Sequence, residues 1–142
     1  AGTRGSRLIA VKPPASPIKI VIPSYTLTRN VPYVPTPLAA DKLIFLLTDS
    51  GIASCMERHT GKIFWKERLE GNFFASPIII NDVIVIVSRM GEITTLKIND
   101  EKMTVLGKSQ LGELTHNTPA AGTNFLFFRT YSKLFCLPFE QL

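Results

Sequence analysis

The sequence predicts an all-β fold assembled from repeated units, and three observations support this prediction. A Ser/Thr-Pro dipeptide recurs with prolines 40 and 42 residues apart, as Thr36-Pro37, Ser76-Pro77 and Thr118-Pro119. An apolar run rich in β-branched or aromatic residues follows each dipeptide, at 43–47, 83–87 and 125–128. A turn follows each run, and in the first two copies it contains a glycine, Gly51 or Gly91. Short β-rich repeats of this length favour a β-propeller built from four-stranded antiparallel blades.

The blades are expected in a definite order along the chain. Residues 1–30 form the latter half of a blade, with a third strand at 6–11 and an outer strand at 18–22. Because Val, Ile, Phe and Thr alternate with Gly, Asn-Asp and Pro breaks, each later unit divides into short strands. The complete blade at 31–71 has strands at 34–39, 43–48, 51–57 and 62–68.

The second complete blade, at 72–113, has strands at 75–80, 83–88, 92–98 and 103–109. An incomplete blade at 114–142 has strands at 117–120, 125–129 and 133–137. The total is about 13 strands, so the fold class is a partial propeller. A closed propeller needs at least about four complete blades, and this chain alone therefore leaves open blade edges.

Composition indicates a folded domain. Apolar residues make up 45% and charged residues 19% of the 142 residues, which is typical of globular proteins. No apolar run approaches the roughly 20 residues that span a bilayer, so we expect no membrane span. The N-terminus has no apolar stretch resembling a signal peptide.

The net charge of +5 arises from the first 40 residues, which contain five basic residues and no acidic one: Arg4, Arg7, Lys12, Lys19 and Arg29. These charges alternate with apolar residues, as on the solvated face of a strand. The competing interpretation is a basic patch for nucleic acid or a membrane surface, which we consider the weaker of the two.

The two cysteines, Cys55 and Cys136, stand in separate apolar strand segments. Neither belongs to a CxxC pair, and no histidine spacing supports a zinc site. We expect both to be small buried side chains, with a disulfide between them as the alternative.

The sharpest local motif lies at 55–65, where Thr60-Gly61 precedes Trp65 by four residues. Thr-Gly suits a tight turn because glycine accepts a positive φ. Trp65 then lies on the outer strand, where a large ring can pack between adjacent blades. We expect the blade-packing residues to be Trp65, Gly61, Thr60, Gly51 and Gly91.

This motif resembles the repeat of the pyrroloquinoline-quinone-like, or quinoprotein-like, β-propellers, which contains Thr-Gly followed by Trp. Thr60, Gly61, Trp65 and the preceding Gly51 match that repeat, and the likeness extends from about residue 6 to residue 137. The chain is most similar to the C-terminal blades of repeat proteins abundant in planctomycetes. In the second copy, residues 99–102 replace Thr-Gly, and Val105 stands where the tryptophan is expected.

The quinoprotein dehydrogenases of this superfamily use a complete ring, acidic and amide ligands for a cation, and often adjacent cysteines. This sequence has one tryptophan, no Cys-Cys pair and no visible cation cluster. We therefore expect no catalytic residues, no metal and no cofactor. A possible binding rim consists of His116, Arg89 and Arg129, because the two arginines follow equivalent strands and His116 precedes an inner strand. His59 is expected to be an exposed turn residue.

Three functional hypotheses follow. The favoured one is a non-catalytic propeller scaffold that mediates protein–protein interaction in the periplasm or cell envelope of a bacterium. The alternative is a fragment of a quinone-dependent dehydrogenase whose active site lies in other blades. The weakest is a binder of nucleic acid or acidic surfaces through the basic N-terminal segment.

The open blade edges imply association with a protein partner or with a second copy. In one arrangement, the strand at 18–22 completes the blade at 125–137 of a second copy. In the other, further blades of the natural protein fill the gap.

Overall fold

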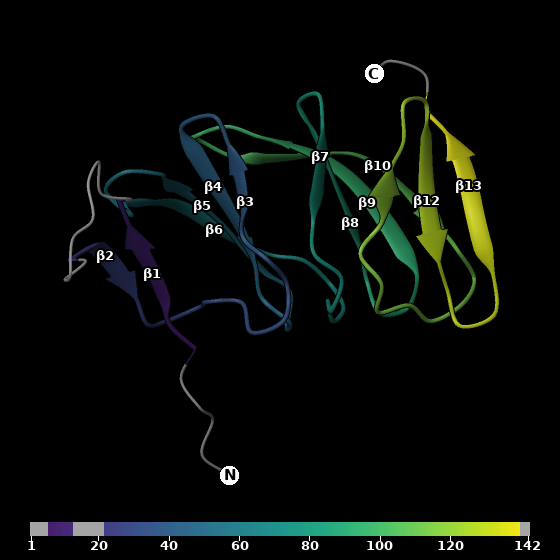
Figure 1. The fold of residues 1–142 in the computed structure, drawn as a ribbon, viewed down its shortest axis with the longest axis horizontal. Helices are drawn as coiled ribbons and strands as arrows, with labels where there is room; N and C mark the ends of the chain where they lie inside the picture. The colour runs from purple at the N-terminus through teal and green to yellow at the C-terminus, as the bar shows by residue number, and fades with distance from the viewer. Residues whose placement is uncertain (1–5, 13–21, 140–142) are drawn as a thin grey trace, which may run out of the picture.

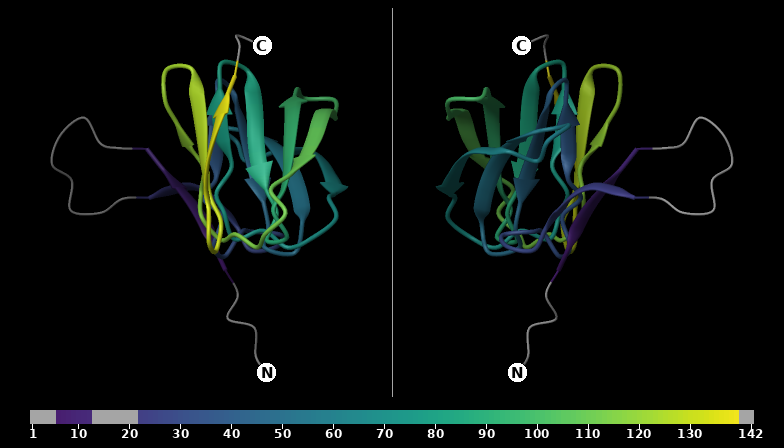
Figure 2. Two further views of the ribbon diagram at one scale, coloured as in Figure 1. Left: turned by 90° about the vertical axis from the view of Figure 1, so that its right-hand side faces the viewer. Right: turned by 90° about the vertical axis from the view of Figure 1, so that its left-hand side faces the viewer.

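A computed structural model describes residues 6–12 and 22–139. Within these ranges the chain is all-β, with 13 strands in four antiparallel sheets. The sheets, which we name A to D, lie side by side in sequence order (Figure 1). Seen from either end, they form successive blades with a common orientation (Figure 2). This arrangement confirms the predicted partial propeller.

Sheet A has two strands among the described residues, β1 (Leu8–Val11) and β2 (Pro23–Leu27), and Leu8 pairs with Leu27. The outer strand was expected at 18–22. That prediction falls largely on residues 13–21, which lie outside the described ranges, and the strand that pairs with β1 begins at Pro23.

Sheets B and C each have four strands in the order expected for a propeller blade. Sheet B comprises β3 (Leu38–Ala40), β4 (Leu43–Leu47), β5 (Ile52–Glu57) and β6 (Ile63–Arg68). Sheet C comprises β7 (Ile78–Ile80), β8 (Val83–Val87), β9 (Glu92–Ile98) and β10 (Met103–Gln110). In the part of the chain that the structure describes, sheet D has three strands, β11 (Ala120–Ala121), β12 (Phe125–Arg129) and β13 (Leu134–Pro138).

The inner strands β3, β7 and β11 begin later than expected. They start at Leu38, Ile78 and Ala120, whereas the sequence suggested starts at 34, 75 and 117. Each inner strand is preceded by the Pro of its Ser/Thr-Pro dipeptide, and proline cannot donate a backbone hydrogen bond to the ladder. The dipeptides therefore lie in the approach to the inner strands.

Two apolar cores lie between the sheets, and β8 contributes to both. Side chains alternate across a strand, so Ile84 and Ile86 enter the core between sheets B and C, while Val85 and Val87 enter the core between C and D. All five residues of β8 are buried. Sheet C is thus covered on both faces. This explains why strand β8 is an uninterrupted run of Val and Ile.

The side chains of Tyr25 and Trp65, which we call the bridging rings, connect consecutive sheets. On β2, the Tyr25 hydroxyl donates a hydrogen bond to the backbone oxygen of Arg58 at 2.9 Å, across the A–B boundary. On β6, Trp65 Nε1 donates to the backbone oxygen of Asn99 at 2.8 Å, across the B–C boundary. Trp65 is partly buried and packs against the B–C core. Each ring therefore combines apolar contact with one directed hydrogen bond.

The counterpart of Trp65 in sheet C is Gly107, which corrects the expectation of Val105. Trp65 pairs with Cys55, four residues after Gly51, and Gly107 pairs with Thr95, four residues after Gly91. The paired residues are 10 apart in sheet B and 12 apart in sheet C, so the longer β9–β10 hairpin displaces the position by two residues.

The recurring Ser/Thr-Pro dipeptides are joined to one another by hydrogen bonds. The Thr36 backbone N–H donates to Ser76 Oγ at 3.0 Å, and the Ser76 N–H donates to Thr118 Oγ1 at 2.9 Å. A small hydroxyl in each copy thus accepts the amide of the preceding copy. This contact gives a physical reason for the Ser/Thr of the repeat.

The cysteines have different environments, and both are free. Cys55 is fully buried as expected, and burial raises the pKa of its thiol to about 11. The expectation that Cys136 is buried is wrong, because its side chain is exposed. Phe135 and Leu137 of β13 pack against the C–D core, so Cys136 between them points to the opposite face of sheet D, which no further sheet covers among the described residues.

We predict that Trp65→Ala lowers the free energy of unfolding by about 3 kcal/mol, at the lower end of large-to-small aromatic substitutions because the ring is partly exposed. Trp65→Phe retains most of the apolar contact but loses the hydrogen bond, so it should cost about 1 kcal/mol. Urea denaturation followed by circular dichroism measures both. Equal stability of Trp65→Ala and the native protein would show that the ring does not hold sheets B and C together.

Candidate functional site at the loop rim

The predicted rim residues Arg89, His116 and Arg129 line one pocket of about 320 Å³. The pocket lies where the β8–β9 turn, the β10–β11 connection and the β12–β13 turn meet, at the lower end of sheets C and D in Figure 1. We call it the rim pocket. Its other lining residues are Leu114, Thr115, Asn117, Thr130 and Tyr131.

The β8–β9 turn sets the position of Arg89. Gly91 has a φ of +82°, which a side chain would strain, and a Cβ there would lie 2.3 Å from the backbone oxygen of Glu113. The β10–β11 connection therefore packs directly against this glycine. Ser88 closes the turn, because its hydroxyl accepts the backbone N–H of Glu92 at 3.1 Å.

Backbone hydrogen bonds hold the β10–β11 connection between the two turns. The Thr115 N–H donates to the Arg89 oxygen at 2.9 Å, and the Tyr131 N–H donates to the Leu114 oxygen at 3.1 Å. The buried Thr115 hydroxyl also donates to the Arg129 oxygen at 2.6 Å. The β10–β11 connection is thus fixed both to the turn that carries Arg89 and to the strand that carries Arg129.

The imidazole of His116 packs against the ring of Phe74, which belongs to the preceding inter-sheet connection. The ring centroids are 4.8 Å apart and the planes are tilted by 55°. The next residue, Asn117, is held by its backbone N–H, which donates to Thr115 Oγ1 at 3.1 Å. An aromatic contact and a hydrogen-bonded loop therefore orient His116 at the pocket.

The rim pocket has a positive electrostatic character. Arg89 and Arg129 are exposed, and no carboxylate is among the lining residues. Of the ion pairs found within 6–12 and 22–139, none includes either arginine. A guanidinium provides donors in a fork that matches a carboxylate or phosphate group. The arrangement can bind an anionic group without first breaking an ion pair.

Glu113, which precedes the lining residue Leu114, is engaged by the β12–β13 turn. Its carboxylate accepts hydrogen bonds from the Thr130 hydroxyl at 2.7 Å and from the Ser132 hydroxyl at 2.7 Å, and it pairs with Lys133 at 3.1 Å. These donors, with Thr130 first, lower the pKa of Glu113 to about 2. Glu113 thus fixes the turn that carries Tyr131.

Of the predicted blade-packing residues, Gly91 lies in the β8–β9 turn at the rim pocket, whereas Gly51, Thr60, Gly61 and Trp65 belong to sheet B and its turns. Gly61 has a φ of +74°, and a Cβ on it would meet the Tyr25 ring at 2.6 Å. The ring therefore rests directly on the Thr60-Gly61 turn. Gly51 lies in the β4–β5 turn, equivalent to Gly91. His59 is exposed, as expected. The role of the glycines and of Thr60 in blade packing remains a prediction.

One periodic signal at the rim was not used in the sequence interpretation. In sheets B, C and D, a hydroxyl residue directly follows the second strand and accepts a backbone N–H at or next to the start of the third strand, through Thr48, Ser88 and Thr130. These positions have the same 40- and 42-residue spacing as the prolines. That spacing was available in the sequence and marks the turns that form the rim.

Among residues 6–12 and 22–139, no group of three or more His, Cys, Asp or Glu side chains is arranged to hold a metal ion. The same ranges contain no helix long and apolar enough to cross a membrane.

Comparisons with known proteins identify the fold. No protein-family model and no curated protein sequence matches the chain. The crystal structure of BamB from Moraxella catarrhalis matches with a TM-score of 0.74 and 18% identity, over 96% of this chain and 41% of that one. A europium-containing methanol dehydrogenase matches with a TM-score of 0.52 and 15% identity, over 63% of this chain and 19% of that one.

These likenesses show that the chain has a quinoprotein-like β-propeller fold, as the Thr-Gly and Trp motif suggested. The chain spans less than half the length of the BamB structure. At these levels of identity the likeness concerns the fold, since one fold hosts many functions.

The low pKa of Glu113 predicts how stability depends on pH. The folded-state pKa of about 2 lies below the ordinary value of 4.5, so the carboxylate stabilises the folded state above pH 4.5. This contribution is lost as the pH falls from about 4.5 to about 2. Glu113→Gln should therefore lower the Tm at pH 6, and the difference from the native protein should shrink toward pH 2. A Tm difference that stays constant over this range would contradict the assignment.

Proposed function

We propose that this chain is part of a non-catalytic β-propeller scaffold that mediates protein–protein interaction, and that its rim pocket binds an acidic group of the partner. The observation that supports this proposal is the convergence of Arg89, Arg129 and His116 on one pocket lined by no carboxylate. Because both guanidiniums are free to bind a new anion, an Asp or Glu side chain of a partner matches the site chemically.

The rigidity of the rim favours binding as well. Both turns and the connection between them are held by backbone hydrogen bonds and by the buried hydroxyls of Thr115 and Thr130. A site that is organised before binding loses less conformational entropy when the partner arrives. Loops placed by a rigid β scaffold commonly carry function.

The end sheets offer further surface for a protein partner or for self-association. On β1, Ile9 and Val11 are 54% and 53% exposed. On sheet D, the side chains of Phe125, Phe127 and Leu134 are exposed. Exposed apolar side chains on an open sheet are suited to a protein interface.

The likeness to BamB supports a location in the periplasm or cell envelope of a bacterium. The alternative is that the chain is a segment of a quinone-dependent dehydrogenase. The structural match to the methanol dehydrogenase is the observation that favours this alternative. Calcium-dependent binding of pyrroloquinoline quinone to the 142-residue chain, measured by titration calorimetry, would favour this alternative over the scaffold.

The acidic-partner proposal can be tested with a fluorescein-labelled hexaglutamate peptide and fluorescence anisotropy. We predict that the double variant Arg89→Ala/Arg129→Ala binds the peptide at least tenfold more weakly, because each charged hydrogen bond contributes about 1.5–3 kcal/mol.

The matched control is Lys66→Ala/Arg68→Ala on β6. It also removes two positive charges, but from exposed residues that do not line the rim pocket. The control should retain most of the affinity. Equal losses in both double variants would show that the peptide responds to net charge alone, and the rim proposal would then be wrong.

A further inference from the structure

The two bridging rings occupy equivalent positions in their sheets. Tyr25 pairs with Ala10 and Trp65 pairs with Cys55, and in each case a β-bulge interrupts the outer strand next to the ring. Both rings point toward the following sheet and donate a hydrogen bond to a backbone oxygen in its turn between the third and fourth strands. At two successive boundaries, the outer strand thus supplies one aromatic ring.

At the third boundary, between sheets C and D, this ring is missing. Gly107 pairs with Thr95 beside the bulge of β10 and so takes the position of Tyr25 and Trp65. Its φ lies outside the left-handed region, and a Cβ would meet only Thr95 Oγ1, at the ordinary distance of 3.5 Å. The backbone therefore accepts a side chain at position 107.

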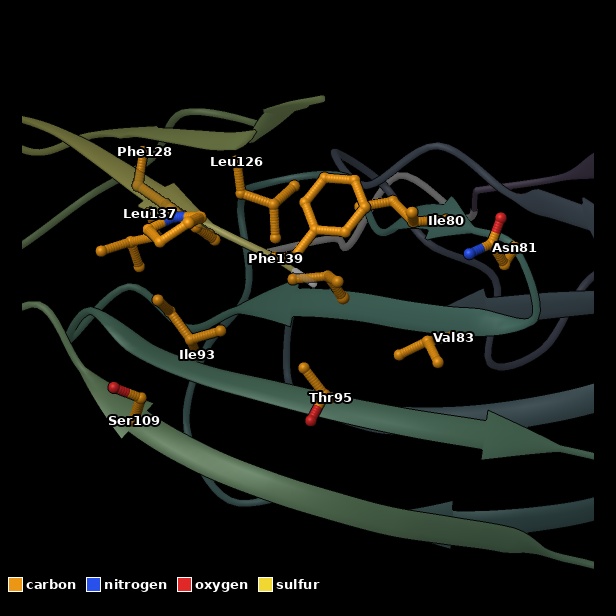
Figure 3. Close-up of a pocket in the computed structure, with 12 residues that line it drawn as sticks. Ile80, Asn81, Val83, Ile93, Thr95, Ser109, Leu126, Phe128, Leu137 and Phe139 are labelled. Atoms are coloured by element: carbon orange, nitrogen blue, oxygen red, sulfur yellow. The ribbon is translucent and has the colours of Figure 1, made fainter. Parts of the chain in front are cut away.

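A cavity of about 340 Å³ lies between sheets C and D and is lined by Thr95, the residue that pairs with Gly107. Thr95 and Ser109 line it from sheet C, on the same face of the sheet as Gly107. Leu126, Leu137 and Phe139 line it from sheet D, and Figure 3 shows these side chains converging on the cavity from opposite sides. The lining is mostly apolar, with a few polar groups, as in small-ligand sites.

Between sheets B and C, Trp65 and Met103 both pack against the core, and the fourth strand of sheet C contributes Met103. Sheet D shows no fourth strand in the part of the chain that is described, so no counterpart of Met103 reaches the C–D cavity from those residues. Among the described residues, the C–D boundary thus has a counterpart of neither side chain.

Leu137 and Pro138 of β13 line the cavity, and β13 is the edge strand of sheet D among the described residues. The Lys133 oxygen accepts the Thr130 N–H, and the Phe139 N–H donates to the Asn124 oxygen, so the odd-numbered residues of this segment bond to β12. In an antiparallel ladder the backbone groups alternate in direction, so those of Leu134 and Cys136 face the edge. An extended segment can pair with this edge and pass the cavity.

We propose that the C–D cavity receives an aromatic side chain of a partner polypeptide that pairs with the free edge of β13. This inference rests on the proposed interaction function and names a recognition feature for it. Strand addition supplies main-chain hydrogen bonds, and a pocket for one side chain supplies specificity. A ring is the expected occupant because this molecule places a ring at the two equivalent boundaries, and the Thr95 and Ser109 hydroxyls can bond to an indole N–H or a phenol.

The probe for this site is N-acetyl-L-tryptophanamide, titrated into the 142-residue chain and followed by methyl NMR. Shifts are expected at Ile93, Leu126 and Leu137, which line the cavity. Gly107→Trp supplies the missing ring from within, so it should weaken probe binding at least tenfold. The matched control is Val105→Trp, which places the same ring two residues away, opposite Leu96 on the face turned toward sheet B.

The proposal is supported if Val105→Trp binds the probe within twofold of the native protein and Gly107→Trp does not. The absence of cavity shifts in the native protein at millimolar probe would overturn it, as would unchanged binding by Gly107→Trp. If Gly107→Trp does not fold, Gly107→Leu fills part of the same space and must also weaken binding.

A separate arm distinguishes this inference from the rim proposal. The Arg89→Ala/Arg129→Ala variant should bind N-acetyl-L-tryptophanamide as the native protein does, because the rim pocket and the cavity share no lining residue. Loss of hexaglutamate binding alone would leave the cavity assignment standing. Failure of the tryptophan probe with intact hexaglutamate binding would overturn the cavity assignment only.

Discussion

The bridging ring is the interaction on which the stacking of these sheets depends. Sheets B and C are apolar on the faces that meet, and apolar contact alone does not fix how one sheet lies on the next. Trp65 adds direction, because its indole N–H reaches the Asn99 oxygen while its ring packs on the B–C core. Tyr25 does the same for sheets A and B through the Arg58 oxygen.

The hydroxyl contacts near the inner strands complement the rings at the outer strands. Ser76 and Thr118 accept the amides of Thr36 and Ser76, respectively, so sheets B and C are joined near their inner strands as well as at the outer strand, and sheets C and D near their inner strands. The rim pocket depends on this alignment, since Arg89 comes from sheet C and Arg129 from sheet D. A rigid relation between sheets thus keeps two guanidiniums on one pocket.

The repeat predicted the fold well, because period, strand runs and turn residues are local properties of the sequence. It also brought together Arg89, Arg129 and His116, since equivalent turns of adjacent blades lie at one rim. It missed Tyr25 and misplaced the counterpart of Trp65, because β-bulges and the longer β9–β10 hairpin shift the register in ways that residue spacing does not show. The exposure of Cys136 depends on which strands surround β13, and the apolar sequence around it carries no such information.

The central claim, that a ring on the outer strand joins sheet A to sheet B and sheet B to sheet C, can be tested on a single proton. The sequence contains one tryptophan, so the indole N–H of Trp65 gives one NMR signal. Bonded to the Asn99 oxygen at 2.8 Å, this proton should exchange with deuterated solvent on the timescale of sheet separation and at least about a hundredfold more slowly than in free tryptophan. Exchange at the rate of free tryptophan in the folded protein would contradict the account.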